Sequence, residues 1–175
     1  SFQTMNKLLL SFAILFFSAN FLSAQNDFVL RQKFVLDNNV PVKIIAAPDL
    51  EALHLEDIER DKLGMLYRIG LASTVNITPL NSGIWTTLPN GDRKWQLVVK
   101  SSGAEALSFL FETFKLYGAS TLVITDLNGK LVHNPLTSDD VESHFRQHAA
   151  LCFGDELLLT LIEPKYTQSS ELFLD

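Results

Sequence analysis

Histidine and serine are the residue types in this sequence that could support hydrolytic catalysis. A serine-protease triad needs a serine held against a histidine, a carboxylate that orients the histidine, and an oxyanion hole. The histidines are His54, His133, His144 and His148. None of the serines lies in a glycine-flanked nucleophile motif, and Ser102-Gly103 is better explained as a turn. We therefore predict no catalytic residues in this chain.

His144 and His148 have a spacing that could bind a metal ion. Four residues apart on a helix, the two imidazoles would share one face. A carboxylate could come from Asp139, Asp140 or Glu142. No further ligand has the spacing that makes a metal motif specific. We interpret both histidines as part of a polar surface loop, and we predict neither a metal nor a cofactor.

Trp85 and Trp95 flank an Asn90-Gly91 turn and could form a platform on which a sugar stacks. Trp95 shares its side of a strand with Leu97 and Val99, so we predict that it belongs to the core. Trp85 is more open, and we predict that it is at most half-buried. A carbohydrate therefore stays a possible partner of this chain.

Composition and cysteine content exclude several classes of protein. The formal net charge is -6, and lysine and arginine form no cluster, which argues against a surface for nucleic acid or anionic membrane. Cys152 is the only cysteine, so the chain forms no internal disulfide. Because Cys152 lies between Leu151 and Phe153, we predict a buried thiol rather than a reactive one.

The N-terminal residues have the layout of a secretory signal. Met5-Asn6-Lys7 gives a basic start, Leu8–Leu22 is apolar, and Ser23-Ala24 supplies small residues before polarity returns. The apolar run is about 15 residues, shorter than the ~20 needed to span a bilayer as a helix. We predict cleavage near Ala24–Gln25, secretion through the periplasm, and no membrane attachment after cleavage.

The rest of the chain alternates in the manner of short strands, after one helical segment. Asp49–Leu63 is acidic, with apolar residues at roughly helical spacing. Residues 94–100 show the clearest half-buried alternation, while residues 107–111 fit a strand or a helix. The other expected strands are 40–46 (an edge, because of Pro41), 67–71, 75–77, 84–88, 121–126, 131–133 and 157–163. With Asn-Gly turns at 90–91 and 128–129, they predict an all-β fold: an antiparallel, jelly-roll-like β-sandwich preceded by a short helical or linker segment.

An ordered set of short motifs resembles a known family. The motifs are Leu55-Glu56-Asp57, Arg60-Asp61, Tyr67-Arg68-Ile69-Gly70, Ser82-Gly83-Ile84-Trp85, Leu88-Pro89-Asn90-Gly91, Trp95-Gln96-Leu97, Ser102-Gly103-Ala104, Phe114-Lys115-Leu116 and Glu163-Pro164. Over Leu55–Pro164 this order resembles the N-terminal non-catalytic region of secreted lysyl-endopeptidase-like serine proteases of bacteria, often Bacteroidota. Tyr117 stands where that family usually has proline, and Asn134 where glycine is common.

The resemblance implies a precursor with a trypsin-like catalytic domain in cis, of which this chain is a fragment that helps the enzyme fold or holds it inactive. The expected organisation is upstream residues 1–4, a signal peptide over 5–24, a pro-segment or linker over 25–64, a β-sandwich over 65–164, and a linker with the start of a missing downstream domain over 165–175. The alternative is a secreted sandwich module that binds carbohydrate or another surface ligand. A metal-dependent enzyme using His144 and His148 is a weaker third hypothesis.

Overall fold

A computed structural model describes residues 34–140 and 146–175. The chain divides into two units, Ser1–Val35 and Leu36–Asp175, and every helix and strand described below belongs to the second. The predicted signal peptide over 5–24 and His144 lie outside the described residues.

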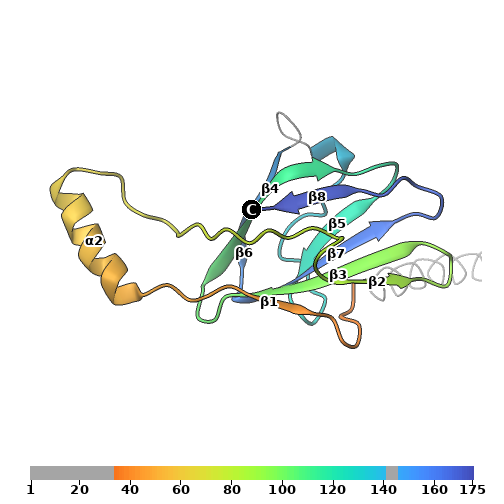
Figure 1. The fold of residues 1–175 in the computed structure, drawn as a ribbon, viewed down its shortest axis with the longest axis horizontal. Helices are drawn as coiled ribbons and strands as arrows, with labels where there is room; N and C mark the ends of the chain where they lie inside the picture. The colour runs from red at the N-terminus through yellow and green to blue at the C-terminus, as the bar shows by residue number, and fades with distance from the viewer. Residues whose placement is uncertain (1–33, 141–145) are drawn as a thin grey trace, which may run out of the picture. The chain divides into compact units, whose positions relative to one another are not determined.

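The second unit contains two sheets (Figure 1). The first sheet has the order β1-β3-β7-β5, and β2 also pairs with β3. Its strands are β1 (Val42–Ile44), β2 (Ile84–Thr87), β3 (Arg93–Lys100), β5 (Thr121–Thr125) and β7 (Glu156–Glu163). The second sheet has the order β6-β4-β8, with β4 (Ala106–Lys115), β6 (Gln147–Phe153) and β8 (Glu171–Leu174). All pairs are antiparallel except β1 with β3, and neither sheet closes.

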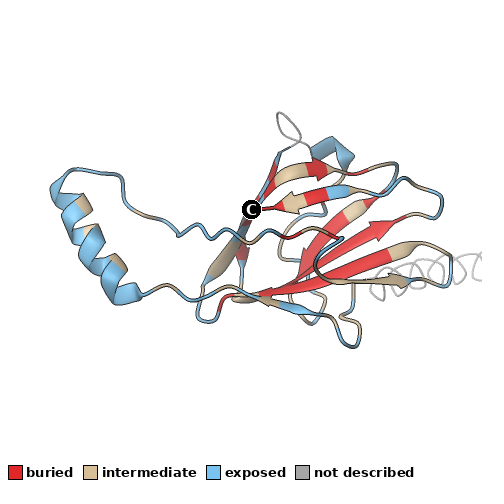
Figure 2. Cartoon of the chain, in the orientation of Figure 1, coloured by how far each residue is buried: buried red, intermediate tan, exposed pale blue. Residues whose placement is uncertain are grey.

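Both sheets contribute side chains to one cluster of buried apolar residues (Figure 2). Alternate side chains of a strand lie on the same face of its sheet, so every second residue can enter this cluster. Trp95, Leu97 and Val99 enter it from β3, which confirms the prediction for that strand. β7 lies between β3 and β5, as expected of a strand that is apolar on both faces. Other members are Phe109, Phe111 and Phe114 from β4, Cys152 from β6, Leu157, Leu159 and Leu161 from β7, and Leu172 and Leu174 from β8.

The polar face of β3 is buried as well, which the alternation alone did not predict. Lys94 and Gln96 are nearly inaccessible because the segment before β1 lies against them. Asp37 accepts from Lys94 Nζ at 2.7 Å, and its backbone N–H donates to Gln96 Oε1 at 3.1 Å. The side that was expected to face solvent therefore carries a partly buried ion pair and a long-range hydrogen bond.

The two Asn-Gly turns form as predicted, but only their glycines take positive φ. Gly91 has φ 88° and Gly129 has φ 82°. The backbone of Asp126 pairs with Lys130 across the second turn, with N–H to O at 2.9 Å. The return segment 131–133 is not a strand: it touches β5 through an isolated bridge from Leu131 to Thr125.

Three segments differ from the sequence-based expectation. Residues 67–71 form no strand, and in 75–77 pairing is limited to an isolated bridge at Ile77. β1, expected in the segment that leads to the sandwich, pairs with β3. β8, expected to begin a following domain, pairs with β4 and buries Leu172 and Leu174. Both pairings join residues far apart in sequence, which local patterns do not reveal.

Candidate functional site

The described histidines do not come together. His54 lies in α2 (Leu50–Lys62), and His133 Nδ1 is 2.7 Å from the backbone oxygen of Asn134. His148 lies on β6, with Nε2 2.7 Å from Ser108 Oγ on β4. Over residues 34–140 and 146–175, no group of three histidine, cysteine or acidic side chains is close enough to hold a metal ion.

The contact between Ser108 and His148 is the nearest arrangement to a nucleophile with a base. It lies on an exposed face at a β-bulge, where the register between β4 and β6 shifts. In the part of the chain that the structure describes, no hydrogen bond links His148 to a carboxylate, so the orienting group of a triad is missing there. We interpret the pair as a cross-strand hydrogen bond. Sequence reasoning missed it because it depends on strand register over 40 residues.

Arg93 occupies the centre of a second polar cluster, at the paired ends of β2, β3 and β7. Its guanidinium lies 5.2 Å from the centre of the Trp85 ring and forms an ion pair with Glu163. Arg93 Nη2 also donates to Ser169 Oγ at 2.9 Å. Trp85 Nε1 donates to the backbone oxygen of Pro79 at 2.9 Å. Trp85 is half-buried, as predicted, and Arg93 takes up space over its ring.

Glu163 is fully buried, with 0% of its side chain exposed. A buried carboxylate is stable only when it is paired and hydrogen-bonded. Arg93 supplies the opposite charge, and the backbone N–H of Ser170 donates to Glu163 Oε1 at 2.5 Å. This carboxylate therefore ties the loop before β8 to the end of β3, which is a structural role.

Gly83 and Trp95 form a tight contact that explains why glycine is needed there. Trp95 Nε1 donates to the backbone oxygen of Ser82 at 2.7 Å. Gly83 has φ 78°, and a Cβ at this position would lie 2.3 Å from Trp95 Nε1. Any other residue would be strained and would displace the indole. These two motif residues therefore help to build the core.

The exposed arm, residues 49–74, is the candidate interaction surface. It contains α2, which Asp49 caps through Oδ1 hydrogen bonds from the N–H groups of Glu51 and Ala52 and which buries no residue. This confirms the predicted acidic helix. The arm exposes many large apolar side chains: Leu50, Leu55, Ile58, Leu63, Met65, Leu66, Tyr67, Ile69 and Leu71. Exposed apolar side chains that gather in one segment often mark a site where a partner binds.

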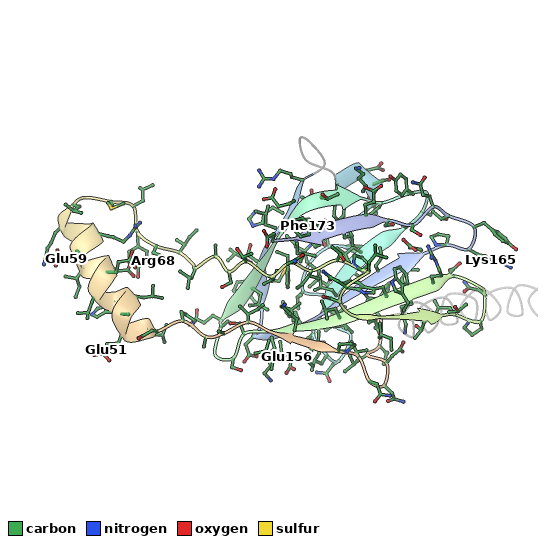
Figure 3. The ribbon with its side chains drawn as sticks, in the orientation of Figure 1. Glu51, Glu59, Arg68, Glu156, Lys165 and Phe173 are labelled. Atoms are coloured by element: carbon green, nitrogen blue, oxygen red, sulfur yellow. The ribbon has the colours of Figure 1, made fainter. Side chains whose placement is uncertain are left out.

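Ion pairs brace the arm internally. Arg68 pairs with Glu56 at 2.8 Å and with Asp57 at 2.9 Å, so the chain after α2 folds back on the helix (Figure 3). The hydrogen bond that Arg68 donates to Glu56 is the main cause that raises the pKa of Arg68 above its usual value, and the contacts with Asp57 add to it. Lys62 pairs with Glu59 at 2.6 Å. Acidic residues outnumber basic ones in the arm, so a partner surface that is apolar and basic fits it.

Comparison with models of known protein families gives no match for this chain, and no solved structure matches it. Across the two described ranges, no helix has both the length and the apolar character needed to cross a membrane.

Cys152 is expected to resist alkylation while the protein is folded. It is fully buried, as predicted, and burial raises the pKa of its thiol to about 11. Below that pH the thiol stays protonated, and the thiolate is the nucleophile. Iodoacetamide at pH 8 should modify the protein rapidly in concentrated urea and hardly at all in buffer. Fast modification of the folded protein would show that the core around β6 is open.

Proposed function

We propose that this chain is the non-catalytic prosegment of a secreted serine protease that resembles lysyl endopeptidases. It would enter the secretory route by the signal peptide over 5–24 and carry its catalytic domain in cis. We further infer that the two sheets stack as a jelly-roll-like β-sandwich, since both contribute to one core. The prosegment would assist folding of the catalytic domain or hold it inactive.

The observation that carries this proposal is the exposed arm. A β-rich body with a dense core holds an apolar, acidic segment whose side chains contact little of that body. Such a surface is costly in water and gains free energy when a partner covers it, by about 25 cal/mol for each Å² of apolar area. A folding catalytic domain that is temporarily apolar and basic would be such a partner.

The motif residues of the resemblance support a non-catalytic role. Gly83 and Trp95 build the core contact, and the buried Glu163 forms an ion pair with Arg93. These motif residues therefore have packing and pairing roles. Serine-protease chemistry would have to come from the catalytic domain.

Residues 26–175 supplied in trans are expected to raise the yield of refolded catalytic domain, or to inhibit the mature enzyme. β-Rich proteases fold slowly because their strands pair over long sequence separations, and a preformed surface can shorten that search. Enzyme activity after refolding with and without the fragment measures the first effect, and a titration against mature enzyme measures the second.

Two variants locate the surface. Leu55→Asp changes an exposed residue of α2 and should weaken both effects without changing the melting temperature. Leu80→Asp is the control, since Leu80 is also exposed (97%, against 60% for Leu55) but lies in a loop outside the arm. If the wild-type fragment changes neither folding nor activity at a large excess over enzyme, the prosegment proposal is wrong.

A carbohydrate-binding module is the second candidate. The partial exposure of Trp85 on β2 favours it, because an accessible indole can stack on a sugar ring. Oligosaccharide binding that is lost in Trp85→Ala, together with no effect on the protease, would support this module instead of the prosegment.

A further inference from the structure

Residues 67–77 have the sequence of a half-buried strand. Odd positions are apolar at Tyr67, Ile69, Leu71, Val75 and Ile77, with Ser73 as the exception. Even positions are polar or small throughout. Such alternation is typical of a strand with one face on a core. The last two apolar residues, Val75 and Ile77, do pack against the core.

The rest of this segment has no strand partner in the described chain. Ile77 exchanges two hydrogen bonds with Leu174, at 3.0 and 2.9 Å, while residues 66–74 belong to no ladder. Ile69 is 97% exposed. The segment is exposed at its beginning and reaches the core only at its end. An exposed strand-like edge of this kind can pair with another polypeptide segment.

The register at Ile77 shows where that partner would lie. The bridge from Ile77 to Leu174 is antiparallel, so residues before Ile77 run alongside residues after Leu174. β8 uses its other edge to pair with β4. In Figure 1 the β8 arrow points to the C label, and the chain coming from α2 passes close to this end of β8. Asn76 has φ 49° and its N–H donates to Asp175 Oδ1 at 3.3 Å, so the ladder bends there.

We propose that residues 67–75 form the fourth strand of the second sheet, paired with the polypeptide that follows Asp175 in the precursor. This rests on the proposed function, in which the chain continues into a catalytic domain. The bridge at Ile77 sets an antiparallel direction for the new pair and places it on the edge of β8 that faces away from β4. The bend at Asn76 leaves open which residues would pair with each other. The occupant is an extended segment, in line with β8, whose apolar side chains lie next to those of Tyr67, Ile69 and Leu71. Its backbone would satisfy the free edge of the arm, as in strand addition.

Hydrogen exchange followed by mass spectrometry tests the pairing. The two samples are the full precursor without its signal peptide, kept with a serine-protease inhibitor, and residues 26–175. Amides 67–75 should exchange rapidly in the shorter chain and about 100-fold or more slowly in the precursor, because a ladder opens only through local unfolding. Equal, rapid exchange in both samples would overturn the pairing.

A pair of variants separates pairing from general stability. Ile69→Asp places a charge on the face that would become buried, and it should remove the protection in the precursor while leaving the melting temperature of residues 26–175 unchanged. Leu66→Asp is the control, since Leu66 is 88% exposed and precedes the alternating segment. Protection that survives Ile69→Asp would also overturn the proposal.

The outcomes for the pairing and for the proposed function are distinct. A gene that continues into a serine protease without protection of residues 67–75 would contradict the pairing alone. Protection of these amides in a chain that continues into something other than a protease would contradict the prosegment alone. A stop codon directly after Asp175 would overturn both.

Discussion

Replacing Trp95 by alanine is expected to prevent stable folding of residues 26–175. Trp95 is 1% exposed at the centre of the shared core. Truncating a buried tryptophan costs about 3–5 kcal/mol, which is a large part of the ~5–15 kcal/mol that stabilises a domain. The change also removes the donor for the backbone oxygen of Ser82. Urea denaturation followed by far-UV circular dichroism measures the loss.

Trp85→Ala is the matched control for this variant. Trp85 lies opposite Trp95 in the pairing of β2 with β3 but is only half-buried. Its truncation should cost less, roughly 1–2 kcal/mol, because less apolar area returns to water. If Trp95→Ala unfolded at the same urea concentration as the parent, the packing described for β3 would be wrong.

Arg93→Met is expected to destabilise the fold by about 3–5 kcal/mol, the range measured when one partner of a buried ion pair is removed. The variant leaves the carboxylate of Glu163 buried, with the N–H of Ser170 as a remaining donor. It also removes the cation from the Trp85 ring. Thermal or urea unfolding at pH 7 gives the magnitude.

Glu163→Gln should cost clearly less than Arg93→Met. The two partners are unequally buried: 43% of the Arg93 side chain is exposed, against 0% for Glu163. A guanidinium that loses its partner here can be hydrated, whereas a carboxylate at position 163 cannot. Equal losses for both variants, or a larger loss for Glu163→Gln, would contradict this asymmetry.

Local sequence patterns were sufficient to predict the strands whose two faces differ in polarity. Trp95, Leu97 and Val99 alternate with polar residues, and Pro41 correctly marked β1 as an edge strand. The helical spacing within Asp49–Leu63 was likewise sufficient for α2, whose Asp49 cap is a local feature.

Long-range partners could not be predicted in this way. The alternation puts Lys94 on the side of β3 opposite Trp95, and nothing near it in sequence shows that Asp37, 57 residues earlier, covers it. The pair of Arg93 with Glu163 spans 70 residues, and Ser108 meets His148 only through strand register. For residues 67–71 the strand prediction was wrong for the described chain: a strand also needs a neighbouring strand, and the described residues supply none.

The pairing of both β1 and β2 with β3 has a consequence for solubility. β3 is eight residues long and apolar at its centre, a sequence that could template the addition of a foreign strand and start aggregation. Two short strands divide its outer edge between them: the four residues of β2 cover Arg93–Gln96, and the three of β1 cover Val98–Lys100. A chain that began after Ile44 would leave the Val98–Lys100 half uncovered. The segment before α2 therefore completes the sheet and also covers an edge of β3 that could otherwise pair with another copy of the chain.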